Sequence, residues 1–283
     1  MSFIDLHCHS TASDGTLPPA EVVRLASKSG LTAMSLTDHD TVAGQAQAAA
    51  EATALGIDFV TGIEISAEHP RPGTLHMLGY GVDPSSTVLT SLTEKLIDAR
   101  GDRNPRIVER LNEVGVAVTM DEWKTQADGG VLGRPQLAAI LLRKGYVSSI
   151  KNAFEKYLGE GGLAYFDKER LTSRRAIEMI RQSGGVAVLA HPVQLRKENF
   201  AQLETTIKQL VDEGLAGVEV IHSDHDELTV RELTRMAEKY RLLKTGGSDF
   251  HGGNKPTIGL GIANGRRVPR EWFDLLLEKV RSA

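Results

Sequence analysis

The stretch Phe3-Ile4-Asp5-Leu6-His7-Cys8-His9 indicates how the chain begins to fold, because a short apolar run leads directly into two histidines. On an extended strand successive side chains point to opposite faces, so His7 and His9 would share one face and Cys8 would lie on the other. Both imidazoles could then reach one cation, whereas Cys8 would be a small buried hydrophobic residue. Histidine pairs with this spacing are also common on protein surfaces, so the interpretation depends on the rest of the chain.

Strand-like and helix-like segments alternate outward from this stretch along most of the chain. Short apolar runs predict seven strands, and the longer segments between them predict helices. This alternation predicts an α/β protein with a parallel sheet closed into a barrel. The predicted strands are residues 3–6, 33–36, 59–65, 74–80, 185–190, 217–221 and 242–245, and the predicted helices around them are 17–29, 42–55, 173–183, 200–213, 227–240 and 269–281.

Nine side chains that can bind metal ions fall in or just after these predicted strands. In α/β barrels the functional loops lie at the C-terminal ends of the strands, so residues far apart in sequence would meet at one mouth. A cluster of divalent cations is the simplest single cause of this pattern. The candidates are His7, His9, Asp14, His39, Glu64, His76, His191, Asp249 and His251.

The chemistry of these nine side chains limits the metal. All of them offer nitrogen or oxygen, which disfavours structural zinc bound by thiolates and suits Mn²⁺, Fe²⁺ or catalytic Zn²⁺. The number of carboxylates favours manganese. We therefore expect two or three Mn²⁺ ions, with Zn²⁺ or Fe²⁺ as alternatives.

Residues 100–165 interrupt the alternation, because they contain predicted helices (106–114, 135–144 and 149–157) and no convincing strand. They hold ten Lys and Arg against eight Asp and Glu, a charge of +2, whereas 23 against 29 in the remainder give −6. We expect a barrel domain formed by residues 1–99 and 166–283 and an inserted helical lid subdomain over an anionic substrate. The alternative for the insertion is a solvated helical face.

The composition predicts a soluble cytoplasmic protein. The chain has 283 residues, of which 41% are hydrophobic, and a net charge of −4, so general adhesion to long nucleic acids or anionic membranes is not expected. A single cysteine excludes an internal disulfide framework. We expect no signal peptide, since no basic stretch precedes an apolar one at the N-terminus, and no membrane span, since no run of about 18 apolar residues occurs. No obligate protein partner is inferred.

Five motifs together resemble the polymerase-and-histidinol-phosphatase (PHP) family of the amidohydrolase-like enzymes, over almost the whole chain. They are Asp5-Leu6-His7-Cys8-His9-Ser10 with Ser13-Asp14-Gly15, Leu36-Thr37-Asp38-His39-Asp40, Gly62-Ile63-Glu64, Ala190-His191-Pro192 and Gly247-Ser248-Asp249-Phe250-His251. The resemblance implies a distorted (β/α)7 barrel. The stretches 132–135 and 154–158 resemble the branch of 3′,5′-nucleotide bisphosphate phosphatases, some of which also trim short RNA from the 5′ end.

The resemblance also implies a division of the ligands. One metal would be held by His7, His9, Glu64 and Asp249. Glu64 would bridge to a second metal that His76 and His191 complete, and Asp14, His39 and His251 would hold a third. The third site is the most variable, because some relatives carry histidine at the position of Asp14.

We expect hydrolysis of a phosphate monoester by a metal-bound hydroxide, since phosphoryl transfer mainly needs charge stabilisation and in-line placement. His7, His9, Glu64, Asp249 and His251 would be the catalytic group. Ser10 and Ser13 would be loop residues that position ligands, and Asp38 or Asp40 would orient an imidazole. His69 is expected to have no special role. The candidates for substrate contact are Arg134 first, then Arg103, Asn104 and Lys156, and also His222 and His225, for which a surface polar role is the alternative.

The function expected from these observations is removal of the 3′-phosphate from a 3′,5′-nucleotide bisphosphate, for example pAp to AMP plus phosphate. Histidinol phosphate or another small phosphomonoester is an alternative substrate, and stepwise 5′ to 3′ exonuclease action on short RNA would use the same cluster. A metal-binding interaction module, as in bacterial replicative polymerases, and a C–N bond hydrolase remain open.

Overall fold

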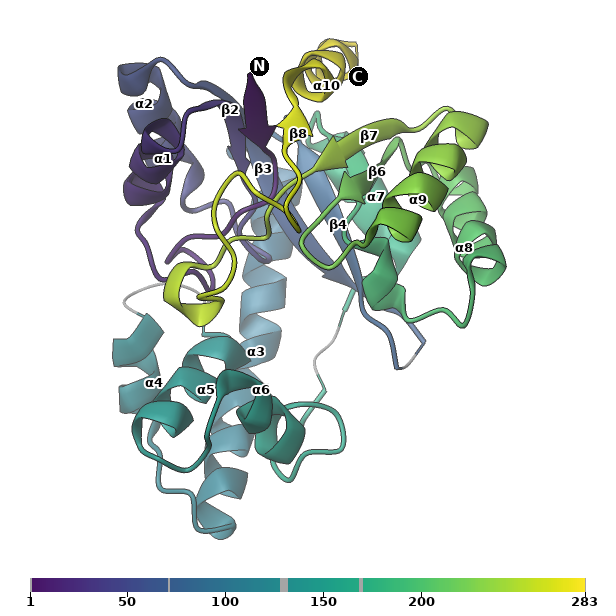
Figure 1. Ribbon diagram of the computed structural model, residues 1–283. Helices are drawn as coiled ribbons and strands as arrows, with labels where there is room; N and C mark the ends of the chain where they lie inside the picture. Colours follow the sequence, from purple (N-terminus) through teal and green to yellow (C-terminus); the bar gives the residue numbers. More distant parts are fainter. Residues whose placement is uncertain (1, 71, 128–131, 168–169, 283) are drawn as a thin grey trace.

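The fold is an α/β barrel, seen in a computed structural model that describes residues 2–70, 72–127, 132–167 and 170–282 (Figure 1). Within these residues eight strands form one sheet, in the order β7-β6-β5-β4-β3-β2-β1-β8. The predicted α/β barrel is therefore confirmed, with one short additional strand, β8. The strands are β1 (Phe3–Asp5), β2 (Leu31–Leu36), β3 (Asp58–Ala67), β4 (Leu75–Tyr80), β5 (Val186–Leu189), β6 (Gly217–Ile221), β7 (Leu243–Gly246) and β8 (Val268–Pro269).

Strand β4 corrects the predicted parallel sheet, because it runs antiparallel to both β3 and β5. Parallel neighbours need a long crossover, usually a helix, but only residues 68–74 join β3 to β4. The chain therefore turns back at the rim of the barrel, and Ser66 near the end of β3 pairs with His76 near the start of β4. This reversal brings His76 to the rim at which the parallel strands end.

The barrel closes where the chain after β1 meets the chain after β7. The N–H of Leu6 donates to the carbonyl oxygen of Gly246 (3.1 Å), and the N–H of Asp249 donates to the carbonyl oxygen of His7 (2.8 Å). Gly247 allows this approach, since a Cβ atom at that position would collide with the backbone nitrogen of His7. The segment carrying His7 and the segment carrying Asp249 are thus held side by side.

Helices cover the outside of the barrel, and their amphipathic sequences explain how they pack. In α7, the side chain of Thr172 accepts a hydrogen bond from the N–H of Arg175 at the start, and Ala176, Ile177 and Ile180 are buried in the core. None of the helices within the described ranges combines the length and apolarity needed to cross a lipid bilayer. The helices of the barrel are α1 (Pro19–Lys28), α2 (Gln45–Leu55), α7 (Ser173–Gln182), α8 (Phe200–Asp212), α9 (Glu227–Tyr240) and α10 (Arg270–Arg281).

The helical segment, residues 100–165, lies at one end of the barrel and has a hydrophobic core of its own (Figure 1). Helix α3 links the two parts, because Leu89 near its start packs in the barrel core and Ile107 packs in the core of the segment. This helix is continuous for 27 residues and runs across the expected boundary between residues 99 and 100. The elements are α3 (Thr87–Glu113), α4 (Met120–Ala127), α5 (Arg134–Arg143), α6 (Ile150–Ala153) and the π-helical turn η1 (Phe154–Leu158).

Candidate metal centre

All nine predicted ligands lie together at the rim of the barrel. They fall into small groups in which the candidate ligand atoms are within 4.8 Å of one another. The strands and their extensions supply them, since His7 and His9 follow β1, Glu64 lies in β3 and Asp249 follows β7. Residues from remote parts of the sequence therefore meet where the barrel architecture predicts.

The first group contains His7, His9, Glu64 and Asp249. The Nε2 atom of His9 lies 3.3 Å from both Glu64 Oε2 and Asp249 Oδ1, and His7 Nε2 lies 3.4 Å from the same Glu64 oxygen. Four ligands about 2.1 Å from a tetrahedral cation are about 3.4 Å apart. Within the described part of the chain, His7 Nε2, His9 Nε2 and Glu64 Oε2 are buried without a hydrogen-bond partner. Spacing and missing partners both fit a divalent cation between them.

The second group is centred on the other oxygen of Glu64. Its Oε1 atom lies 2.8 Å from His76 Nδ1 and 2.9 Å from His191 Nε2. The two oxygens of one carboxylate therefore face two different groups of imidazoles. Such a carboxylate can bridge two cations, as the resemblance implied for Glu64.

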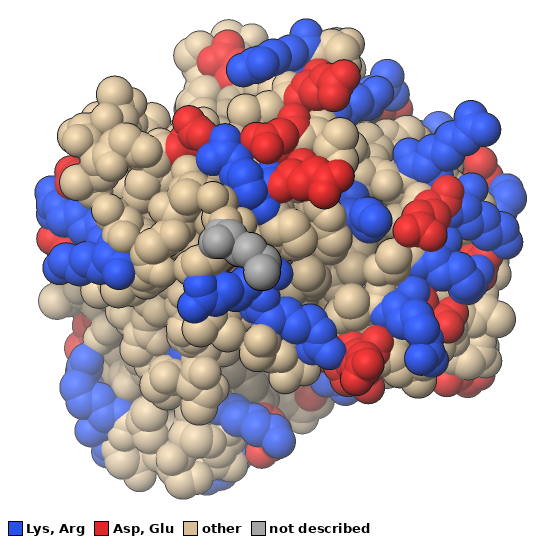
Figure 2. Space-filling model, turned by 45° about the horizontal axis from the view of Figure 1, so that its top comes forward, with Lys and Arg blue, Asp and Glu red and all other residues tan. Residues whose placement is uncertain are grey.

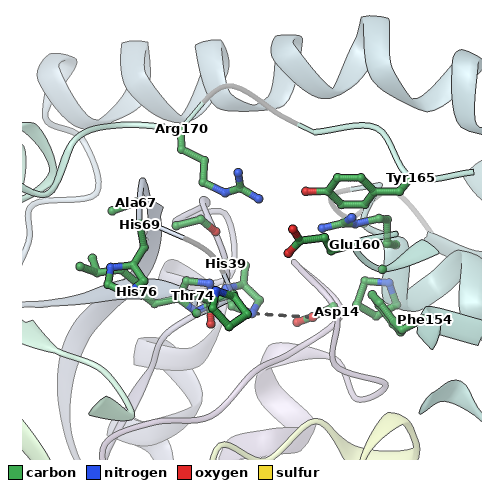
Figure 3. A pocket seen from close by; sticks show the side chains of 18 of the residues that line it. Asp14, His39, Ala67, His69, Thr74, His76, Phe154, Glu160, Tyr165 and Arg170 are labelled. Atoms are coloured by element: carbon green, nitrogen blue, oxygen red, sulfur yellow. Dashed lines mark ion pairs between the residues drawn. The ribbon is translucent and has the colours of Figure 1, made fainter. Parts of the chain in front are cut away.

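The third group contains Asp14, His39 and His251, with His9 beside them. Asp14 Oδ1 lies 3.2 Å from His251 Nε2, and Asp14 Oδ2 lies 3.8 Å from His39 Nε2 (Figure 3). His9 turns its Nδ1 atom to this group, 3.6 Å from Asp14 Oδ1, while its Nε2 atom faces the first group. A neutral imidazole has one free lone pair, so His9 can bind a metal in only one of the two groups.

Burial and neighbouring charges set the protonation of these side chains. Burial lowers the pKa of His39 to about 3 and that of His191 to about 4, although Glu64 opposes the shift in both cases. Burial also acts against protonation of His9, but the carboxylates of Asp249 and Glu64, each 3.3 Å from its Nε2 atom, outweigh it and raise the pKa to about 9. Burial is outweighed at His7 too, where Glu219 and Glu64 hold the pKa well above its usual value. Imidazoles that are neutral at neutral pH are ready to bind metal, whereas His7 and His9 must first lose a proton.

Backbone strain occurs at two of the ligands. The φ angle is 24° at His191 and 59° at Asp249, a region that residues other than glycine rarely adopt. Such conformations persist only where the surroundings impose them, and they are concentrated at functional sites. The turns after β5 and β7 thus aim these two side chains at the rim.

Buried carboxylates hold the loops that carry the ligands. Asp38 accepts hydrogen bonds from the backbone N–H and the hydroxyl of Ser10 (2.8 and 2.7 Å) and from the hydroxyl of Ser13 (2.6 Å). Asp40 accepts one from the N–H of Ser66 (2.9 Å). Asp38 therefore fixes the loop before Asp14, with Ser10 and Ser13 as the loop residues that the sequence suggested.

Two charged residues of the centre were not predicted. Glu219, in the middle of β6, is fully buried and lies 3.0 Å from His7 Nδ1, and Lys255 Nζ lies 2.5 Å from Asp249 Oδ2. A signal for Glu219 was present, because it is a lone charge within the apolar run Gly217–Ile221. Lys255 follows a glycine-rich turn and has no comparable signal in the sequence.

A cavity of about 460 Å³ opens beside the rim that carries the candidate metal ligands, between the barrel and the helical segment. Asp14, His39 and His76 line one side, and residues of the segment and of the chain that follows it line the other (Figure 3). Those on the other side include Arg103, Arg134, Phe154, Tyr165 and Arg170, and Figure 3 shows the side chains of Arg170 and Tyr165 projecting above the imidazoles.

Two of the predicted substrate residues, Arg134 and Arg103, line this cavity. Arg134 donates to the carbonyl oxygen of Leu158 (2.8 Å), and its guanidinium lies 5.2 Å from the ring centre of Tyr165. Asn104 and Lys156 are not among the lining residues described. Asn104 donates to Leu132, and Lys156 is an exposed side chain beside Tyr157.

His222 and His225 are buried, so the surface alternative for them is wrong. The Nδ1 atom of His222 accepts a hydrogen bond from the N–H of Asp224 (3.0 Å), and its Nε2 atom lies 3.4 Å from Asp249 Oδ2. His225 contacts the carbonyl oxygen of Val220 through Nδ1 (2.9 Å). Both histidines lie beneath the rim, and neither lines the described cavity. His69, expected to have no special role, does line it.

A barrel with a rim of imidazoles and carboxylates and an arginine-lined cavity defines a metal-dependent hydrolase of the phosphoesterase type. Comparison with known families places the chain in this class, because the model of the PHP domain matches residues 5–220. The chain belongs to the PHP domain family.

Curated relatives carry three different activities in their names. The chain is 36% identical to a 5′-3′ exoribonuclease of Haemophilus influenzae, over 87% of this chain and 89% of that protein. It is 32% identical to a phosphoribosyl 1,2-cyclic phosphate 1,2-diphosphodiesterase of Eggerthella lenta (91% and 98%). It is also 32% identical to a 3′,5′-nucleoside bisphosphate phosphatase of Chromobacterium violaceum (89% and 88%).

A solved structure agrees with this fold. A candidate metal-dependent phosphoesterase from Bifidobacterium adolescentis superposes with a TM-score of 0.88 at 30% identity, over 98% of this chain and 96% of that one. The whole chain, including the helical segment, therefore corresponds to one family architecture.

Proposed function

We propose that this protein removes the 3′-phosphate from a 3′,5′-nucleotide bisphosphate, converting pAp to AMP plus phosphate. The observation that carries the proposal is the cavity in which candidate metal ligands on one side face arginine side chains on the other. A substrate with two phosphates presents one anion to each side. A relative named for this activity, 32% identical over nearly all of the chain, supports the proposal.

In this proposal His7, His9, Glu64 and Asp249 hold one ion, Glu64, His76 and His191 a second, and Asp14, His39 and His251 a third. His7, His9, Glu64, Asp249 and His251 are also the proposed catalytic group. Ions bound there would supply Lewis-acid chemistry, neutralising phosphoryl oxygens and lowering the pKa of water. Mn²⁺ is the proposed metal because carboxylates contribute to every group, with Zn²⁺ or Fe²⁺ as alternatives.

The helical segment is proposed as a lid that selects the substrate. Arg134 and Arg103 would bind the 5′-phosphate, since guanidinium groups pair well with phosphate oxygens. Phe154 and Tyr165 line the same cavity and offer aromatic faces to the nucleobase. Asn104 would support this group indirectly, because its side-chain oxygen accepts hydrogen bonds from Arg103 (3.0 and 3.2 Å).

Phosphate release from a panel of compounds, with Mn²⁺ added, tests the proposal. The panel contains pAp, 3′-AMP, 5′-AMP and histidinol phosphate, and the expected result is the highest kcat/KM for pAp. Asp249→Asn serves as the inactive control. Preference for histidinol phosphate, or release of ammonia from amide substrates without phosphatase activity, would contradict the proposal.

A second candidate activity is stepwise 5′ to 3′ cleavage of short RNA, favoured by the relative that is 36% identical and named a 5′-3′ exoribonuclease. Lys, Arg, Asp and Glu side chains are interspersed on the face in Figure 2, without a continuous basic stripe for a long strand. Short substrates are therefore expected. A 5′-phosphorylated trinucleotide separates the two activities, because only the exonuclease releases mononucleotides from it. A cytoplasmic location is also proposed, in keeping with the single cysteine, Cys8, which is buried and forms no disulfide.

A further inference from the structure

The buried carboxylate of Glu219 makes two contacts that tie together two proposed metal ligands. Its Oε1 atom lies 3.0 Å from His7 Nδ1, and its Oε2 atom accepts a hydrogen bond from the backbone N–H of His191 at 2.7 Å. His7 faces Glu64 Oε2 in the first group of ligands, and His191 faces Glu64 Oε1 in the second. One side chain therefore contacts both groups from beneath the rim.

The position of Glu219 in β6 explains this reach. Side chains alternate along a strand, and its neighbours Val218 and Val220 pack in the hydrophobic core on the other face. Glu219 points into the barrel, where it is 0% exposed. A charged carboxylate is costly in such surroundings unless its oxygens are paired, and here both oxygens have a partner.

The contact with His7 selects the nitrogen that can bind metal. A carboxylate only accepts hydrogen bonds, so His7 Nδ1 must carry the proton. The lone pair is then on Nε2, the atom that faces Glu64 and Asp249 at 3.4 and 3.7 Å. Carboxylates of this kind orient metal-binding histidines in many proteins.

The contact with His191 supports a strained turn. The backbone of His191 has φ 24° and ψ 65°, and its ring reaches Glu64 Oε1 at 2.9 Å through Nε2. A hydrogen bond from its N–H to a charged acceptor stabilises this conformation. Without that acceptor the N–H would be buried and unpaired, and the turn could relax to an ordinary conformation.

We propose that Glu219 is a positioning residue that couples the first and second metal sites by accepting hydrogen bonds from the His7 ring and the His191 backbone at the same time. The inference rests on the proposed metal centre and does not depend on the substrate. It assigns Glu219 no contact with the substrate or the reacting atoms.

The substitution Glu219→Gln tests the requirement for two acceptors. Glutamine has nearly the same volume but only one acceptor oxygen, and its amide group donates. If the amide faces His7, the proton moves to His7 Nε2 and blocks the metal. If it faces His191, two donors oppose each other and the turn shifts. We expect the affinity for Mn²⁺ to fall by about 10- to 100-fold, and excess Mn²⁺ to restore the metal content.

The control is Tyr80→Phe, which removes another buried hydrogen bond in the barrel, from the Tyr80 hydroxyl to the carbonyl oxygen of Leu6 (2.9 Å). This variant should lower the melting temperature without changing the Mn²⁺ affinity measured by calorimetry. Glu219→Gln with wild-type affinity, or with a lower melting temperature as its only change, would overturn the proposal. Because metal binding is the readout, failure of the substrate assignment would not affect the result.

A second measurement decides the question if Glu219→Gln does not fold. Nitrogen-15 NMR of the wild-type protein loaded with diamagnetic Zn²⁺ reports which ring nitrogen of His7 carries the proton. The expected result is a protonated Nδ1 and a metal-bound Nε2. This measurement needs no variant. A His7 ring with its proton on Nε2, or with no proton on Nδ1, would overturn the proposal.

Discussion

Arg134 offers the sharpest test of how the cavity distinguishes substrates. Arg134 is the first residue of helix α5, and its side chain lines the cavity opposite the imidazoles. The guanidinium remains protonated, although burial lowers its pKa. In the proposed complex it binds the 5′-phosphate. Arg134→Ala should therefore weaken catalysis on a bisphosphate much more than on a substrate that lacks this phosphate.

The magnitude follows from one charge-assisted hydrogen bond. Such a bond contributes about 1.5–3 kcal/mol, which corresponds to a loss of about 10- to 150-fold in kcat/KM for pAp. For 3′-AMP, which has no 5′-phosphate, kcat/KM should change little. Arg134→Lys keeps the charge but loses the planar fork, so an intermediate loss is expected.

The variant also loses contacts within the protein, and these need a control. Arg134 donates to the carbonyl oxygen of Leu158 and stacks near Tyr165, contacts that contribute about 1 kcal/mol each to stability. Lys151→Ala changes an exposed residue of the same helical segment, and kcat/KM should stay unchanged for both substrates. Rates for pAp and 3′-AMP are compared at a temperature at which every variant is folded. An equal loss for both substrates, or no loss for either, refutes the assignment of Arg134 to the 5′-phosphate.

Further outcomes are expected at three residues: Asp14, His9 and Trp123. Asp14→Ala should reduce the metal content by one ion after dialysis while the other ions remain, because Asp14 contributes only to the third group; an unchanged content would contradict this division. The raised pKa of His9, about 9, means that metal displaces a proton at neutral pH. Mn²⁺ affinity should therefore rise at least about tenfold per pH unit up to pH 9, with a further contribution from His7, whose pKa is also raised, and proton release measured by calorimetry in two buffers checks this. The same shift stabilises the metal-free protein fully below pH 6.5 and ceases to do so as the pH rises through 9. Trp123→Ala should cost the helical segment about 3–5 kcal/mol and expose it to limited proteolysis, with unchanged metal content; equal protease resistance would show that Trp123 does not support this core.

The sequence was sufficient to predict the α/β barrel and to identify the candidate ligands at its rim. Period-two spacing put His7 and His9 on one face, and the alternation of strands and helices put Glu64 and Asp249 at strand ends. Both inferences depend on local geometry, which short stretches of sequence determine well. The structure brings these residues into small groups, within each of which the candidate ligand atoms lie within 4.8 Å of one another, because the barrel brings the strand ends together.

Strand direction was not predictable in the same way. The segment 74–80 has the composition of any buried strand, and nothing in it distinguishes a parallel from an antiparallel neighbour. Direction is set by the connection, and the seven residues between β3 and β4 are too few for a helical crossover. Loop length therefore held the information that composition lacked.

Burial separates His222 and His225 from the candidates for substrate contact, and this too depends on tertiary structure. Both follow β6 closely, at a position that in other strands leads to the rim. Here Asp224 turns its N–H back onto His222 Nδ1, so that ring is held beneath the rim with Nε2 toward Asp249. The sequence shows which side chains can bind a metal, but not which of their atoms is free to do so.

Glu219 was not predicted as part of the metal centre, although the sequence contains a signal for it. A lone glutamate in an apolar strand is costly to bury, so its presence implies partners that a list of candidate ligands does not include. A charged residue at a position where burial is predicted is such a signal, and Asp5 is a second example. Asp5 is also fully buried and accepts hydrogen bonds from the N–H groups of His7, Ser248 and Gly261. A buried charge next to a predicted ligand is therefore a sequence signal for the residues that orient a metal centre, separate from the signal for the ligands themselves.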